Sequence, residues 1–180
     1  MKNKFFKTTK WSSDHSNKGE DEINQHLKFF CTINNSSAAL FRKDLLLNMV
    51  NQLDSFIYHG DWYCQLAIAT HTNIAYSAKA MNTFRIHEKN FLRHSKGTQS
   101  KLECFRILDF LYKHEFVTEK KQLLDFFTLQ YLGFGLMKDG FRFGRNLFIS
   151  YAAINRSLSR KVFRSLIWQK VTGKRHKVIF

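Results

Sequence analysis

The sequence predicts a helix-rich α/β fold of the α+β kind, with a few short strands and helices over residues 1–97 and a helical, basic extension over residues 98–180. Three observations support this prediction. The chain has 180 residues, of which 44% are hydrophobic, enough to bury the core of one domain or most of one. Apolar residues recur every three or four positions beyond residue 98. Ten of the net fifteen positive charges lie in the last forty residues, which contain no Asp or Glu.

The first region mixes helical and strand-like patterns. Apolar residues at 45, 46, 49, 50 and 53 have helical spacing, and Trp62, Leu66 and Ala69 share one face of a helix that begins near Asp61. Short apolar runs predict strands, whereas a Ser- and Asn-rich run predicts a loop. The predicted elements, in chain order, are a loop at 12–19, a helix at 20–30, a strand at 37–41, a helix at 43–53, the helix after Asp61, and strands at 73–76 and 80–84.

The second region reads as helices throughout. Apolar stripes at 102, 105, 108, 111 and 112, and at 123, 127, 131 and 134, predict two of them. Four glycines between residues 133 and 144 predict a helix end and a turn, and a last helix is expected over about 146–169.

Several classes of protein are excluded by what the sequence lacks. Its three cysteines are too few and scattered for a disulfide framework, which favours reduced thiols in a cytoplasmic protein. The N-terminus lacks the apolar core of a signal peptide, and no run approaches the ~18–20 apolar residues that span a bilayer. Walker, CxxC, HExxH and GxSxG motifs are all missing.

Asp61 is the first candidate functional residue. It follows Gly60 at a predicted loop-to-helix junction and precedes Trp62. A carboxylate projecting from a helix start can act as a general base toward an incoming hydroxyl. The alternative is an ordinary first-turn aspartate with a core tryptophan behind it, and the strong preference of Asp for helix starts favours that alternative on these residues alone.

Arg85 and His87 form the second candidate. On a strand, period-two alternation puts both on one face, with Phe84 and Ile86 on the other. A guanidinium beside an imidazole suits phosphate binding, metal ligation or acid–base chemistry. An edge strand with polar residues facing water explains the same pattern.

The order of these segments resembles family 2 glycosyltransferases, and most closely bacterial members that build cell-surface polysaccharides. The matching runs are NNSSAALFRK at 34–43, GDW at 60–62, IAY at 74–76 and NTFRIH at 82–87, so the resemblance covers about residues 20–95. It implies the acceptor-side, C-terminal half of a GT-A domain and transfer of a sugar from a nucleotide-sugar to an acceptor hydroxyl.

The resemblance also implies roles for individual residues. Asp61 matches the catalytic base of inverting enzymes, and Trp62 would line the acceptor or sugar pocket. Arg85 and His87 match the element near the donor diphosphate and its divalent metal, Mg or Mn, which His87 would ligate. The donor-binding half, with its strand–helix repeats and Asp-x-Asp motif, has no counterpart in this sequence, so we expect an incomplete enzyme or a fragment that is inactive alone.

The basic extension is the third candidate. Arg156, Arg160 and Arg164 recur every four residues beside an apolar stripe that includes Leu158, Val162 and Leu166. A peripheral helix on the anionic inner face of the cell membrane and simple packing on the core have equal support, because both use that apolar stripe. Nucleic acid is the less favoured partner, since no recognised binding module accompanies the charge.

The sequence therefore predicts a glycosyltransferase fragment in surface polysaccharide synthesis, in the cytoplasm or at the inner face of the membrane, with a glycan or lipid-linked acceptor. The alternative is a non-catalytic basic helical protein that binds anionic membrane or nucleic acid.

Overall fold

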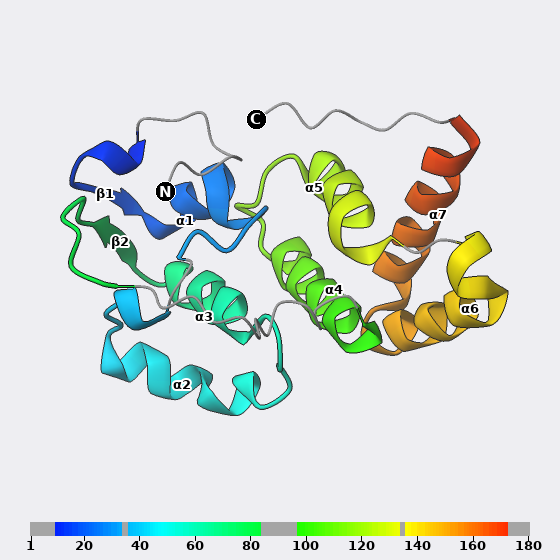
Figure 1. Ribbon diagram of the computed structural model, residues 1–180, viewed down its shortest axis with the longest axis horizontal. Helices are drawn as coiled ribbons and strands as arrows, with labels where there is room; N and C mark the ends of the chain where they lie inside the picture. Colours follow the sequence, from blue (N-terminus) through cyan, green and yellow to red (C-terminus); the bar gives the residue numbers. More distant parts are fainter. Residues whose placement is uncertain (1–9, 34–35, 84–96, 134–135, 173–180) are drawn as a thin grey trace.

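The computed structural model describes residues 10–33, 36–83, 97–133 and 136–172 (Figure 1). The predicted helix-rich fold is confirmed: this part of the chain is mostly helical, with one small antiparallel sheet of two strands. The strands are β1 (His15–Lys18) and β2 (Asn73–Tyr76). The helices are α1 (Gly19–Glu22), α2 (Lys43–Leu53), α3 (Gly60–Ala69), α4 (Thr98–Lys113), α5 (Lys120–Phe127), α6 (Leu136–Ile154) and α7 (Arg156–Thr172). Single π-helical turns extend α1 over Ile23–Leu27 and α5 over Thr128–Leu132.

The sheet joins the start of the described chain to the segment after α3. β2 has the predicted bounds, but its partner β1 lies in the polar segment that was predicted to be a loop, and that prediction is wrong. His15 pairs with Tyr76 in register, and Trp11 packs edge-on against the Tyr76 ring with 5.0 Å between centroids. A strand without apolar alternation forms here because backbone pairing and this aromatic cluster stabilise it.

Two other predicted strands are not formed. Residues 37–41 include a short 3₁₀ turn at Ser36–Ala38 instead, and the described part of 80–84, residues 80–83, has no regular structure. Short apolar runs do not distinguish strands from other buried segments, and a strand also needs a neighbour with free backbone groups.

The core lies around α4, which Figure 1 shows between α3 on one side and α5, α6 and α7 on the other. Leu66 of α3 and Phe105 and Leu108 of α4 are completely buried. The same apolar cluster reaches Leu123 of α5 and Val162 of α7, so it includes residues on both sides of residue 97. Burial of these side chains is the main term that stabilises the fold.

One glycine is required by this packing. A Cβ atom on Gly19, at the start of α1, would stand 1.8 Å from the Ala69 carbonyl oxygen and 2.3 Å from that of Thr72. Only glycine allows the backbone of α1 to approach the end of α3 this closely.

The last predicted helix is divided in two. Asn155 separates α6 from α7: its side-chain oxygen accepts a hydrogen bond from the Leu158 N–H at 3.0 Å, which caps α7. Its amide donates to the Asp109 carboxylate of α4 at 2.6 Å. Gly140 and Gly144 lie inside α6, so the prediction of a turn there is wrong, whereas Gly133 does end the preceding helical turn.

Candidate functional site

Asp61 lies in the first turn of α3, and its side chain is exposed to solvent. Its Oδ1 accepts a hydrogen bond from the Trp62 N–H at 2.7 Å, as expected of an acid in a first helical turn. Its Oδ2 lies 4.0 Å from the Cys31 sulfur. The carboxylate is therefore fixed through Oδ1, while Oδ2 has a longer and weaker contact with the Cys31 thiol.

The loop that leads into α3 is held by a buried acid, Glu103 of α4. This side chain has no exposed surface, and its two oxygens accept hydrogen bonds from the N–H groups of Ile57, Tyr58 and His59 at 2.8–2.9 Å. Gln99, one turn earlier on α4, donates a fourth hydrogen bond at 2.9 Å. Burial alone would raise the pKa of Glu103, but these donors outweigh it and hold the pKa below its usual value. The carboxylate anchors the loop just ahead of Asp61.

His59, two residues before Asp61, makes its own side-chain contact with α4. Its Nε2 lies 2.8 Å from the hydroxyl oxygen of Ser100, which is itself buried. Burial lowers the pKa of His59, although the carboxylates of Glu103 and Asp61 act in the opposite direction. The imidazole is thus kept neutral and structural at neutral pH.

The thiol next to Asp61 is held in its protonated form at neutral pH. Burial raises the pKa of Cys31 to about 12, and the negative charge of Asp61 contributes in the same direction. Cys31 also lies within hydrogen-bonding distance of the Gln65 side-chain oxygen at 3.5 Å and the Ile33 carbonyl at 3.2 Å. The three cysteines carry free thiols.

Trp62 belongs to the core. Its side chain is 2% exposed, its indole N–H donates to the Leu27 carbonyl at 2.8 Å, and its ring stacks on Phe127 with 5.7 Å between centroids. A core tryptophan behind a first-turn aspartate was the alternative to a catalytic Asp61, and Trp62 has that position. The indole packs α3 against the core and does not face the surface that carries Asp61.

Arg85 and His87 lie outside the described residues, as does most of the NTFRIH segment. Across the described ranges, no group of three His, Cys, Asp or Glu side chains is placed to hold a metal ion.

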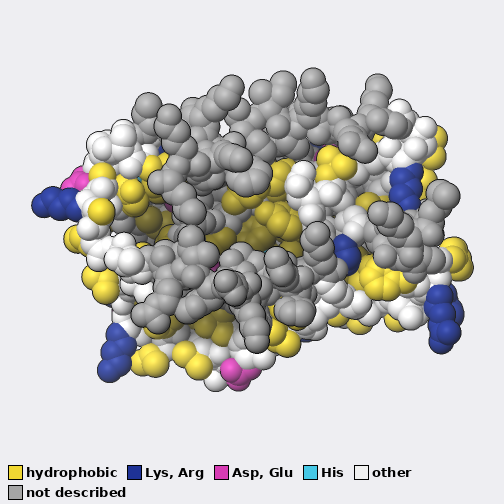
Figure 2. All heavy atoms as spheres, in the orientation of Figure 1, with side chains coloured by type: hydrophobic (Ala, Val, Ile, Leu, Met, Phe, Trp, Pro, Cys, Tyr) yellow, Lys and Arg dark blue, Asp and Glu magenta, His cyan; other side chains and the backbone are white. Residues whose placement is uncertain are grey.

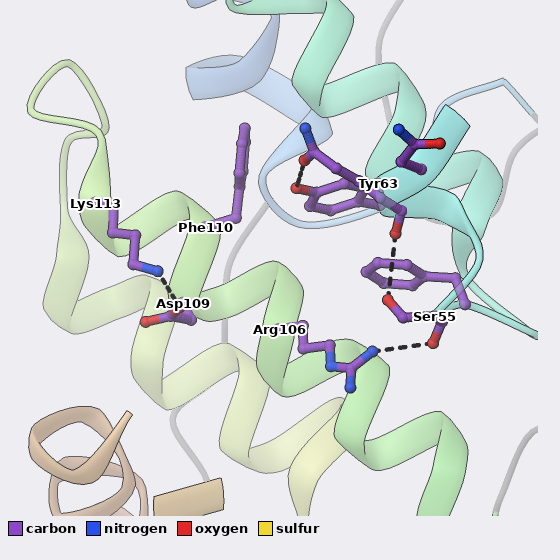
Figure 3. A pocket seen from close by; sticks show the side chains of 9 residues that line it. Ser55, Tyr63, Arg106, Asp109, Phe110 and Lys113 are labelled. Carbon is purple, nitrogen blue, oxygen red and sulfur yellow. Dashed lines mark hydrogen bonds and ion pairs between the residues drawn. The ribbon is translucent and has the colours of Figure 1, made fainter. Parts of the chain in front are cut away.

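A surface pocket of about 310 Å³ opens between the end of α2, α3 and α4 (Figure 3). Phe56 and Tyr63 stack on each other in it with 4.6 Å between ring centroids, and Phe110 stands edge-on to Tyr63. The residues that line it are Asn51, Gln52, Ser55, Phe56, Tyr63, Arg106, Asp109, Phe110 and Lys113. Sequence patterns did not indicate this pocket, because its residues come from three separate segments.

Several polar groups of this pocket already have partners. The Tyr63 hydroxyl donates to Gln52 at 2.7 Å, and Arg106 donates to the Ser55 carbonyl at 3.0 Å. Lys113 pairs with Asp109 at 2.7 Å. A ligand would have to exchange these contacts for its own, and Asp61 does not line the pocket.

The arginines of the basic extension are exposed on α7, as expected. Arg156, Arg160 and Arg164 face solvent, whereas Leu158 and Val162 are buried in the core with at most 2% exposure. Of the two interpretations of that apolar stripe, core packing is the one the structure supports. No helix in the described part of the chain is both long and apolar enough to span a bilayer.

In comparisons with known proteins, no family model, no curated protein and no solved structure matches this chain.

Proposed function

We propose that this chain is the acceptor side of a glycosyltransferase of the family 2 type, in which Asp61 is the general base. The observation that carries the proposal is the placement of one exposed carboxylate at the start of a rigid helix. Glu103 anchors the preceding loop through three backbone N–H groups, and Trp62 anchors the helix in the core. An exposed base on such a support loses little entropy when it meets a hydroxyl.

In the proposed reaction, Asp61 takes the proton of an acceptor hydroxyl while that oxygen attacks the anomeric carbon of the donor sugar. The bond from this carbon to the donor phosphate breaks, and the nucleoside diphosphate leaves with the electron pair. Inversion at the anomeric carbon follows from attack on the opposite face. Oδ2 is the oxygen suited to this role, because its contact with the Cys31 thiol, at 4.0 Å, is weaker than the 2.7 Å hydrogen bond from the Trp62 N–H to Oδ1.

The donor side of the reaction rests on the resemblance alone. Arg85 and His87 are proposed to bind the diphosphate of the nucleotide-sugar, and the nucleotide-binding half is proposed to be supplied from outside the described residues. We place the reaction in the cytoplasm, at the inner face of the membrane, with a glycan or lipid-linked acceptor.

A second candidate function is a non-catalytic protein that binds an anionic surface. The observation in its favour is that Asp61, the proposed base, does not line the pocket between α2, α3 and α4. The outward arginines of α7 would then be the functional residues.

The test measures transfer of radiolabelled sugar from a panel of nucleotide-sugars to extracted lipid-linked and soluble glycans. The full chain is assayed alone and after a family 2 nucleotide-binding half is joined to its N-terminus. We expect transfer from the joined protein. Absence of transfer and of donor hydrolysis across the panel, with a folded protein, would leave the non-catalytic function.

A further inference from the structure

Helix α7 packs one face against the core and exposes the other face to solvent. The composition of the exposed face is unusual for a surface helix. The inward face packs Leu158, Val162 and Leu166 against the rest of the protein. Figure 1 shows α7 at the outer edge of the molecule, so its other face has no helix beyond it in the described structure.

The outward face is basic in its first half and apolar in its second. Arg156, Arg160 and Arg164 occupy successive turns. Residues three, four and seven positions beyond Arg164 continue the same stripe. They are Ile167, Trp168 and Val171. These three side chains are 59%, 60% and 77% exposed. Figure 2 shows Lys or Arg side chains together with hydrophobic ones at the right-hand edge of the molecule, where α6 and α7 lie.

Exposure of three large apolar side chains on one helix face costs free energy in water and needs an explanation. Core packing does not explain it, because the helix already buries its other face. An arginine row that leads into an apolar end, with tryptophan at the boundary, has the composition of a helix that lies in the interface of a bilayer. The helix contains no acid that would oppose an anionic surface.

We infer that the outward face of α7 is a docking surface for an anionic lipid bilayer. The arginines bind lipid phosphates, and the last two turns, with Ile167, Trp168 and Val171, insert beneath the headgroups. Seventeen residues give a helix of roughly 25 Å, long enough for both contacts at once. The inference rests on the second candidate function, whose anionic surface it names as a lipid bilayer, and it does not depend on the proposed sugar transfer.

The experiment is co-sedimentation of the full chain with vesicles of phosphatidylcholine, with and without 30% phosphatidylglycerol, at about 0.15 M salt. We expect partition to the anionic vesicles only. The variant Arg156→Gln/Arg160→Gln/Arg164→Gln is expected to lose roughly a hundredfold in partition, from about 1 kcal/mol per basic residue. Its matched control removes the same charge elsewhere, as Lys18→Gln/Lys43→Gln/Lys79→Gln, at three exposed lysines.

The apolar end is tested separately. Substitution of Ile167, Trp168 and Val171 by Gln is expected to abolish stable partition, whereas the same change at the exposed Leu40, Leu47 and Met81 leaves it intact. Tryptophan emission should shift to shorter wavelength on anionic vesicles and stop shifting in Trp168→Phe, because Trp62 is already buried and Trp11 packs against His15 and Tyr76 at the sheet. Circular dichroism checks that each variant is folded.

Three results would overturn the inference. They are equal partition to neutral and anionic vesicles, no partition to either, and an arginine variant that binds as well as the lysine control. Binding of duplex DNA with an affinity that the apolar variant retains, without vesicle partition, would assign the arginines to nucleic acid instead.

Discussion

The Glu103 carboxylate and the His59 backbone are joined by a hydrogen bond of 2.9 Å, which ties α4 to the loop before α3 across forty-four residues of sequence. The same carboxylate binds the two preceding N–H groups. Three consecutive backbone donors on one buried acid leave the loop little freedom. The position of Asp61, two residues later, is therefore determined by a residue far from it in the sequence.

Replacement Glu103→Gln should destabilise the protein by about 2–4 kcal/mol, because the amide NH₂ cannot accept the hydrogen bonds that the lost oxygen received. Urea unfolding followed by circular dichroism measures this change. The control is Glu115→Gln, at an exposed position just beyond α4, for which we expect less than about 0.5 kcal/mol. Equal effects of the two substitutions would contradict the anchoring role.

The same residue predicts an acid dependence of stability. The pKa of Glu103 is held below its ordinary value of 4.5 in the folded protein, so the folded state binds its proton less readily than the unfolded state. The stabilisation is complete above that ordinary value and is lost as the pH falls through the folded pKa. Urea midpoints between pH 6 and pH 3 should fall less steeply in Glu103→Gln than in the parent chain. Parallel curves would contradict this assignment.

Tyr151→Phe should stabilise the protein by about 1 kcal/mol. The ring is fully buried and lies parallel to Phe105 with 4.4 Å between centroids, while its hydroxyl has no hydrogen-bond partner among the described residues. Removal of a buried unsatisfied hydroxyl therefore gains stability, and the stacking is kept. The matched variant Tyr131→Phe loses a hydrogen bond of 2.9 Å to the Phe29 carbonyl and should lose about 1 kcal/mol. Thermal unfolding of both variants would reveal opposite signs.

Asn155→Ala should cost about 1–3 kcal/mol, because it removes both the cap of α7 and the hydrogen bond to Asp109. Asn155→Asp keeps the cap but sets a second carboxylate beside Asp109, so the repulsion should cost stability that raised salt partly restores. Chemical unfolding at low and at high salt distinguishes the two variants. An alanine variant as stable as the parent would show that the α6–α7 break does not need this side chain.

The local elements that could be predicted from the sequence are those with their own periodicity. The helix Lys43–Leu53 and the strand Asn73–Tyr76 have the bounds that their apolar spacing indicated. β1 could not be predicted, because its polar residues form a strand only when β2 is present. The break at Asn155 was hidden because the apolar stripe continues past it from Tyr151 to Leu158.

For the candidate site, the sequence indicated Asp61 but not the residue that positions it. Glu103 lies within the apolar stripe of α4. The sequence alone does not indicate which groups would pair with a single acid at such a position. Its partners are backbone groups, which leave no signal in side-chain patterns. The resemblance assigned Trp62 to an acceptor or sugar pocket, whereas helical spacing left a core tryptophan as the alternative, and in the structure Trp62 is buried.

The rate of sugar transfer by Asp61→Asn, with the nucleotide-binding half supplied, tests the proposed function most directly. Asp54→Asn, which changes an exposed acid just beyond α2, is the matched control. We predict that Asp61→Asn lowers kcat by at least about a hundredfold, as expected for loss of a general base, while Asp54→Asn keeps the parent rate. Transfer by Asp61→Asn at the parent rate would contradict the account.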